Sequence, residues 1–319
     1  MTLLRIRDLT VEIPTRRGVL RALDRISFDI GPGEIIGVVG ESGAGKSLTG
    51  AAIIGLLAPP GRIAGGSVAL GTDRLDTMPP ERLRRIRGRR IGMIFQDPLT
   101  TLNPLYTVGR QLTETLQTHL GLSDTEARKR AVAWLAEVGI PAPAQRIEAY
   151  PHEFSGGMRQ RVVIALALCA EPELVIAEEP TTALDVSIQA QIIGLLKRLS
   201  RDRGTAVMLI THDMGVIAET ADRVAVMYAG RIVEVGPVAD VIRRPVHPYT
   251  DGLMASIPPL THRMDRLRQI DGAMPRLDAI PSGCAFHPRC RFAMERCRRE
   301  RPDLMPIGAT SAACWLVQT

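Results

Sequence analysis

The sequence lacks any segment that could cross a membrane as a helix. No run approaches the roughly 20 consecutive apolar residues that a bilayer-spanning helix needs. Residues 1–8 mix apolar and charged side chains, which is not the pattern of a secretory signal. The sequence also contains no internal repeat and no low-complexity tract. We therefore expect a soluble cytoplasmic protein whose link to any membrane is made by partner proteins.

Cysteine is nearly absent before residue 284, where Cys169 stands alone in an apolar segment. The remaining cysteines lie close together near the end of the sequence, at Cys284, Cys290, Cys297 and Cys314. In a reducing cytoplasm, clustered cysteines indicate a metal site rather than disulfides.

Length and composition set broad limits. The 319 residues are enough for one large or two modest domains. A hydrophobic content of 45% and a charged content of 23% are ordinary for a globular protein and argue against disorder. The formal net charge of +6 suits a solvated basic surface, a nucleic-acid partner or the anionic face of a membrane, and composition alone does not distinguish these three.

Residues 40–47 read G-E-S-G-A-G-K-S and match the phosphate-binding P-loop pattern G-x-x-x-x-G-K-[ST]. Glycines let backbone N–H groups wrap a triphosphate, while Lys46 supplies a cation for the β- and γ-phosphates and Ser47 a hydroxyl for Mg²⁺. An apolar run at 34–39 predicts the buried strand before the loop, and residues 46–57 predict a helix whose positive dipole end faces the anion. The nucleotide contacts expected here are Gly40, Ser42, Gly43, Ala44, Gly45, Lys46, Ser47 and Leu48.

The rest of the chain alternates strands and helices, which predicts an α/β fold with a mainly parallel sheet covered by helices. Residues 3–13 and 26–30 predict the two strands of an antiparallel hairpin, and residues 97–170 a helical insertion. From about Pro245 the sequence is rich in proline and arginine and shows weak periodicity. Further strands are predicted at 67–70, 91–95, 174–177, 205–210, 224–227 and 231–235, and further helices at 108–120, 125–138, 188–200 and 214–220.

Two acidic residues follow the apolar segment 174–177. This stretch resembles a Walker B segment, an apolar strand expected beside the P-loop strand with acidic residues at its end. The resemblance implies that Glu178 holds Mg²⁺ and that Glu179 orients and deprotonates an attacking water. Upstream, the letters F-S-G-G-M at 154–158 place a serine and two glycines at the start of a predicted helix, a pattern that forms an anion site. This stretch resembles the L-S-G-G-Q signature of ATP-binding cassette proteins.

Other motifs of that family follow in the correct order, and the resemblance covers residues 1–243. It implies a RecA-like core, an antiparallel β subdomain and a helical subdomain at 97–170. Gln96 is implied to touch Mg²⁺ and sense the γ-phosphate, His212 to grip that phosphate, and Asp185 to lie in the D-loop. The residues implied to contact the ATP of a second cassette subunit, so that ATP is sandwiched across a dimer, are Ser155, Gly156 and Gly157.

Three positions depart from the family pattern. Glu178 stands where an aspartate is usual, and its longer side chain changes the geometry available to Mg²⁺. Met158 replaces the usual signature glutamine but leaves the Ser-Gly-Gly core intact. Ile13 lies near the usual place of the adenine-stacking aromatic, so an aliphatic side chain or an arginine plane must pack on the base.

Residues 244–319 resemble the C-terminal extension of the ATP-binding subunits of dipeptide/oligopeptide permeases, of the D type with four cysteines. The resemblance rests on H-P-Y-T at 247–250, F-H-P-R-C at 286–290 and the cysteine spacing. In several such subunits the four cysteines hold a [4Fe–4S] cluster. Four thiolates also suit Zn²⁺, but the lack of a C-x₂-C pair favours the cluster, and unliganded thiols are the third alternative.

The resemblance implies an ATP-binding and ATP-hydrolysing subunit of an importer for di- or oligopeptides. Its alternatives are an importer ATPase for nickel or another small solute, a soluble cassette ATPase acting on nucleic acid or ribosomes, and a regulatory nucleotide-binding module without enzymatic activity. The chain lacks the inserted modules and tandem cassettes usual in the cassette ATPases that act on nucleic acid or ribosomes, so no nucleic-acid partner is expected. Two transmembrane permeases that contact residues 97–104, a second and different cassette subunit, and an extracytoplasmic peptide-binding protein are the expected partners. The expected location is the cytoplasmic face of the inner or plasma membrane.

Overall fold

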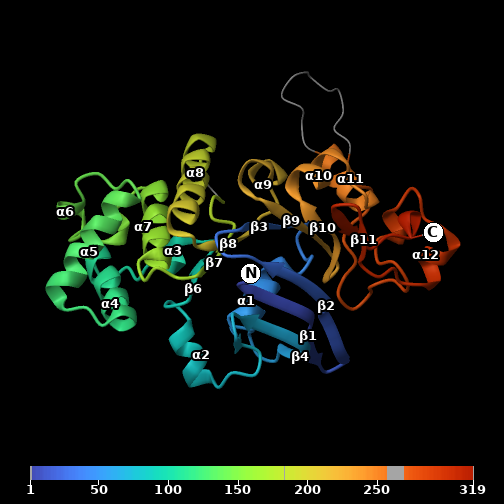
Figure 1. The fold of residues 1–319 in the computed structure, drawn as a ribbon, viewed down its shortest axis with the longest axis horizontal. Helices are drawn as coiled ribbons and strands as arrows, with labels where there is room; N and C mark the ends of the chain where they lie inside the picture. The colour runs from blue at the N-terminus through green and yellow to red at the C-terminus, as the bar shows by residue number, and fades with distance from the viewer. Residues whose placement is uncertain (1, 183, 257–268, 319) are drawn as a thin grey trace. The chain divides into compact units, whose positions relative to one another are not determined.

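The N-terminal hairpin, the P-loop and the tail of the chain fold together, and the helical insertion folds with the acidic strand (Figure 1). The computed structural model describes residues 2–182, 184–256 and 269–318. We call the insertion with its strands unit 1 and the remainder unit 2. Unit 1 comprises residues 31–35 and 77–209, and unit 2 comprises the described parts of 2–30, 36–76 and 210–319.

Unit 2 contains a four-stranded antiparallel sheet in the order β2-β1-β4-β5. Side chains in its first strand alternate, with Leu4 and Ile6 fully buried between exposed arginines. The predicted hairpin is present, but its strands are longer than expected because the turn occupies only residues 16–17. The strands are β1 (Leu4–Thr15), β2 (Gly18–Ile30), β4 (Arg62–Leu70) and β5 (Asp73–Arg74).

The P-loop strand of unit 2 is β3 (Ile35–Val39), and all five of its residues are buried. It pairs in parallel with β9 (Arg223–Tyr228), which pairs antiparallel with β10 (Arg231–Pro237). A continuous apolar run is what a strand covered on both faces requires. The helices of this part are α1 (Lys46–Ile53), α9 (Met214–Thr220) and α10 (Val238–Arg243).

The tail adds strands to this sheet, which the sequence pattern did not predict. Strand β12 (Thr310–Ala312) pairs antiparallel with β10, with Glu234 opposite Ala312, and β11 (Met305–Ile307) pairs with β12. Strands of three residues are too short to show an alternating pattern. The remaining tail elements are α11 (Pro248–Ala255), η2 (His287–Arg289), α12 (Glu295–Arg299) and η3 (Trp315–Val317).

In unit 1, strands lie in the order β8-β7-β6, and β6 (Ile91–Ile94) runs parallel to β7 (Leu174–Glu178). Helices α4 (Val108–Leu120) and α5 (Asp124–Glu137) match the predicted 108–120 and 125–138 closely, because strong signals mark their ends. Ser123 and Glu126, for example, form a reciprocal capping box at the start of α5. The other elements are β8 (Ala206–Ile210), α2 (Pro80–Ile86), α3 (Pro98–Thr101), α6 (Pro143–Arg146), η1 (Pro151–Glu153), α7 (Gly156–Leu168) and α8 (Val186–Arg203).

Helix α1 ends earlier than the predicted residue 57. The N–H of Leu56 donates to the carbonyl of Ala51 at 2.8 Å, and Gly55 has φ of 65°, which together form a glycine-terminated helix end. The apolar residues after Ile53 therefore belong to the helix end and the following loop.

Among the described residues, no helix is both long enough and apolar enough to span a bilayer.

Candidate functional site

The P-loop joins the end of β3 to the start of α1, and its glycines take backbone angles that other residues rarely adopt. Gly40 has φ of 151° and Gly45 has φ of 102°. A Cβ added at Gly40 would lie 2.2 Å from the carbonyl oxygen of Met227 in β9, so this position has no room for a side chain. The N–H of Gly230 also donates to the carbonyl of Ala44 at 2.9 Å. Close backbone contacts with neighbouring residues thus hold the loop in place.

Lys46 is the first residue of α1 and is only 7% exposed. Its Nζ donates to the carbonyl oxygens of Gly40 at 2.7 Å and Glu41 at 3.0 Å, so the ammonium lies inside the curve of the loop. The N-terminus of an eight-residue helix, a buried cation and glycine-rich backbone together suit a bound phosphate. Ser47 follows on the exposed side of the same helix turn.

His212, which is predicted to contact the γ-phosphate, lies in the short segment between β8 and α9. The N–H of Thr211 donates to the carbonyl of Val38 in β3 at 3.2 Å. On the other side, Asp213 caps α9 by accepting from the N–H of Gly215 at 2.8 Å. His212 is exposed between these two fixed residues. Its backbone is therefore placed beside the strand that enters the P-loop.

In unit 1, the structure brings together Gln96 and Glu179, which are both predicted catalytic residues. They follow the carboxyl ends of the parallel neighbours β6 and β7, the edge where open α/β sheets carry their sites. Gln96 Nε2 donates to Glu179 Oε2 at 3.1 Å, and Thr182 Oγ1 donates to the same oxygen at 2.7 Å. Glu179 has φ of 41°, a strained value for a residue with a side chain. Glu178, half-buried, is the last residue of β7.

The signature residues begin α7. Ser155 caps the helix by accepting from the N–H of Met158 at 3.4 Å. A Cβ added at Gly157 would lie 2.8 Å from Ile188 Cγ2 in α8, which explains a glycine at this helix crossing. Asp185 occupies the position just before α8. The adjoining D-loop residue Ala183 lies outside the described residues.

The four cysteines of the tail line one small cavity of about 10 Å³ in unit 2. Burial, with a smaller contribution from repulsion by the other cysteines, raises the pKa of the Cys284 thiol to about 11. Burial also raises the pKa values of Cys290 and Cys314. Within the described residues, no three or more His, Cys, Asp or Glu side chains are arranged as a metal site. The four thiols thus line one cavity without the geometry of a metal site, although four cysteines are a donor set that suits Cys₄ ligation.

Two residues of the tail, Arg289 and Tyr249, belong to motifs of the sequence but were not predicted to contact the P-loop. Arg289 and Tyr249, both from the tail, contact Glu41 in the P-loop. They lie 248 and 208 residues away along the chain, and no local motif reports such a contact.

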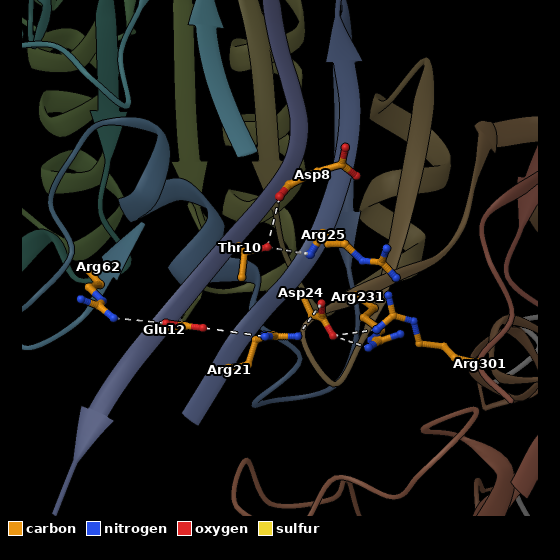
Figure 2. A network of polar contacts seen from close by, with 9 residues as sticks. All are labelled: Asp8, Thr10, Glu12, Arg21, Asp24, Arg25, Arg62, Arg231 and Arg301. Atoms are coloured by element: carbon orange, nitrogen blue, oxygen red, sulfur yellow. Dashed lines mark hydrogen bonds and ion pairs between the residues drawn. The ribbon is translucent and has the colours of Figure 1, made fainter. Parts of the chain in front are cut away.

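A second arginine of the tail contacts the hairpin. Figure 2 shows Asp24 between Arg231 and Arg301, with Arg301 Nη1 at 2.9 Å from Asp24 Oδ2. Glu12 and Arg21 extend this network along the hairpin strands. The tail is therefore tied to the rest of unit 2 at more than one point.

Family comparisons match both parts of the chain. The model described as ABC transporter matches residues 23–182, and the one described as oligopeptide/dipeptide transporter, C-terminal region, matches residues 233–297. A probable peptide ABC transporter ATP-binding protein of Sinorhizobium fredii is 49% identical over 316 residues, covering 98% of this chain and 94% of the relative. A dipeptide transport ATP-binding protein of Haemophilus influenzae is 45% identical over 314 residues, covering 98% of this chain and 95% of the relative.

Solved structures give the same fold. The ATP-binding cassette MJ0796, as a dimer bound to ADP and Pi after hydrolysis, aligns with a TM-score of 0.67 at 28% identity, covering 74% of this chain and 99% of that one. CbiO1 of Clostridium perfringens aligns with a TM-score of 0.65 at 27% identity, covering 76% of this chain and 91% of that one. The predicted α/β cassette fold is confirmed. The chain belongs to the ATP-binding cassette transporter family, among the ATP-binding subunits that carry the oligopeptide/dipeptide transporter C-terminal region.

Proposed function

We propose that this chain is the ATP-hydrolysing subunit of an importer for di- and oligopeptides. The observation that carries the proposal is the match of one chain to both the ABC transporter model and the oligopeptide/dipeptide C-terminal region. Relatives with dipeptide or peptide transport in their names align over nearly its whole length. The phosphate-binding geometry around Lys46 supports ATP as the energy source.

ATP binds, in this proposal, to the N–H groups of residues 42–48 and to the ammonium of Lys46. The ammonium exchanges the carbonyls that it contacts for the β- and γ-phosphate oxygens. Ser47, Gln96 and Glu178 would hold Mg²⁺, which would neutralise charge on those phosphates. Glu178 reaches farther than the aspartate that is usual at this position.

Glu179 acts as the general base. The attacking water gives its proton to this carboxylate as its oxygen bonds to the γ-phosphorus and the bond to the β-phosphate oxygen breaks, leaving ADP and phosphate. The donors Gln96 and Thr182 orient the carboxylate, and the strained backbone of Glu179 supports a functional role for this geometry. His212 donates to the γ-phosphate. Ser155, Gly156 and Gly157 perform the corresponding anion contact for the ATP of a second subunit.

The assembly proposed is a pair of cassette subunits, this chain and a different partner, on the cytoplasmic side of two membrane permeases. Residues 97–104 contact a permease helix, and an extracytoplasmic protein delivers the peptide. Within the chain, residues 1–243 form the ATPase domain, with its helical subdomain at 97–170, and residues 244–319 form the extension. The separate family matches at 23–182 and 233–297 support a cassette part followed by a C-terminal part.

Steady-state ATP hydrolysis by the purified chain, alone and with its permeases, tests the catalytic role. Glu179→Gln is expected to lose roughly 10²–10⁴-fold in kcat, the usual contribution of a general base, while still binding ATP. Glu171→Gln is the matched control. Glu171 precedes the first residue of β7, whereas Glu179 follows the last, and the Glu171 carboxylate contacts Arg203 at the surface. Turnover by Glu179→Gln close to that of the control would remove the role from Glu179.

We also propose that the four tail cysteines ligate a [4Fe–4S] cluster, with Zn²⁺ as the alternative. Their convergence on one cavity, beside His247 and Phe286, supports a shared ligand. The thiols must bind as thiolates and move apart to take it, since the cavity holds no more than a small void.

Metal analysis of anaerobically purified protein, with its visible absorption spectrum, tests this proposal. Four iron atoms per chain and a brown colour are expected, and Cys290→Ser should lose both. Cys169→Ser is the control, because Cys169 is buried in unit 1 and the four tail cysteines belong to unit 2. A colourless protein that contains zinc would show that the ligand is Zn²⁺ and not the cluster. A metal-free protein would contradict both the cluster and the zinc site.

A further inference from the structure

A negative charge lies in the P-loop itself, and the tail neutralises it. Glu41, the second residue of the loop, receives two hydrogen bonds from one guanidinium, Arg289 Nη1 to Oε2 at 2.6 Å and Nη2 to Oε1 at 2.9 Å. The Arg289 side chain is 6% exposed and that of Glu41 is 31% exposed. A two-pronged contact of this kind fixes the direction of the carboxylate as well as its position.

The arginine is itself held by the tail. Its Nε donates to the carbonyl of Asp271 at 2.8 Å, and its Nη2 lies 3.3 Å from the carbonyls of Ile270 and Gly272. The hydrogen bond with Glu41 raises the pKa of Arg289 above its ordinary value. The guanidinium is thus a fixed cation, aimed at the loop before any nucleotide binds.

Tyr249 holds the same P-loop residue through its backbone. The tyrosine hydroxyl accepts from the N–H of Glu41 at 2.9 Å. Its ring packs against Tyr228 at 4.7 Å and Phe286 at 5.4 Å between ring centroids. Since Lys46 donates to the carbonyl of Glu41, this residue is fixed at its N–H, its carbonyl and its carboxylate.

We propose that Arg289 is a positioning residue of the nucleotide site, which makes the tail part of the ATP-binding machinery. This inference rests on the proposed binding of ATP to the P-loop. An uncompensated carboxylate in a loop that wraps a triphosphate would repel the ligand and could turn toward Lys46. Arg289 opposes both effects by pairing with the carboxylate and fixing its direction.

The same contact couples the cysteine cavity to ATP. Cys284 and Cys290 line that cavity and begin and end the short segment that carries Phe286 and Arg289. A rearrangement of this segment would displace Arg289 and with it the contact to the Glu41 carboxylate. By thermodynamic linkage, a tail conformation that favours ATP binding is itself favoured when ATP is bound.

Binding of the non-hydrolysable analogue Mg-AMP-PNP to the full-length chain, measured by titration calorimetry, tests the proposal. Arg289→Ala is expected to weaken binding about tenfold, the size of one uncompensated charge near the phosphates at intermediate dielectric. In the Glu41→Gln background, Arg289→Ala is expected to have little effect, because the charge that it leaves unpaired is gone. Arg291→Ala is the matched control, since Arg291 pairs with Asp251 at the surface two residues on.

The kinetic readout is a raised KM for ATP with a smaller change in kcat, and Arg289→Lys, which keeps the charge but loses the two-pronged contact, should lie between Arg289→Ala and wild type. Two results would overturn the proposal: Arg289→Ala binding as tightly as Arg291→Ala, or equal losses in the presence and absence of the Glu41 carboxylate. Lys46→Ala separates this from the proposed function. If Lys46→Ala binds the nucleotide normally, nucleotide binding at the P-loop is contradicted. If Lys46→Ala loses binding while Arg289→Ala binds normally, only the role of Arg289 is contradicted.

Discussion

The P-loop segment and the cysteine segment at 284–314 belong to the same unit, but their conformations have different origins. In the P-loop segment a buried strand, a glycine loop and a helix follow one another directly, and α1 closes with its own backbone contacts. The cysteine segment has helical stretches of only three to five residues. Distant partners hold it in place, through Arg289, Arg301 and the β10–β12 pairing. The first conformation is encoded locally and the second is imposed by tertiary contacts.

The largest loss of stability is expected from a change at Phe286, one of the contacts that hold the cysteine segment in place. Phe286 is 3% exposed and packs on Tyr228, Tyr249 and His247. Phe286→Ala should lower the free energy of unfolding by about 4 kcal/mol, the usual cost of emptying an aromatic core position. Urea unfolding measures it.

Phe292→Ala is the control, because Phe292 is 47% exposed and its loss empties no core position. If the two variants unfolded at the same urea concentration, packing around Phe286 would not be what holds the tail.

A smaller effect is expected inside the P-loop. Gly40→Ala should lower the free energy of unfolding of the nucleotide-free chain by about 3 kcal/mol, because its Cβ meets a backbone oxygen at a positive φ. Gly43→Ala shares a positive φ but meets nothing within 4 Å, so about 1 kcal/mol is expected. Thermal and urea unfolding compare them, and equal losses would mean that the close approach to Met227 does not constrain the loop.

The smallest effect on the free energy of unfolding is expected where only thiol chemistry is measured and the fold stays intact. Burial raises the pKa of Cys169 to about 12, so its thiolate is scarce near neutral pH and becomes common only as the pH rises toward that value. Alkylation of native Cys169 at pH 8 should be about 10³-fold slower than in urea, where the thiol has its ordinary pKa. Mass spectrometry of the labelled peptide measures the rates, and equal rates would show that α7 opens readily.

The same division decides what could be predicted from the sequence. Helices at 108–120 and 214–220 were predicted at their observed bounds, because caps and apolar spacing are local signals. Helix α1 ended early because Gly55 takes a left-handed conformation that a run of apolar letters does not reveal. Strand β12 is too short for a pattern and exists because β10 offers it a partner.

The candidate site follows the same rule. The residues expected to act on the nucleotide lie in short contiguous motifs, so Lys46 and Glu179 could be proposed directly from the sequence. Their supports could not, because Arg289 reaches Glu41 across 248 residues. The meeting of Gln96 with Glu179 was predictable only through the family order of motifs, and the parallel pairing of β6 and β7 is its physical reason.

Uptake of a radiolabelled dipeptide by cells of the source organism tests the central claim most directly. The chromosomal copy is replaced by Glu179→Gln in one strain and by the control Glu171→Gln in another, with equal protein levels checked by immunoblot. Uptake is expected to fall to background in the first strain and to stay at the wild-type rate in the second. Wild-type uptake in the Glu179→Gln strain would contradict the account that ATP hydrolysis at this site drives peptide import.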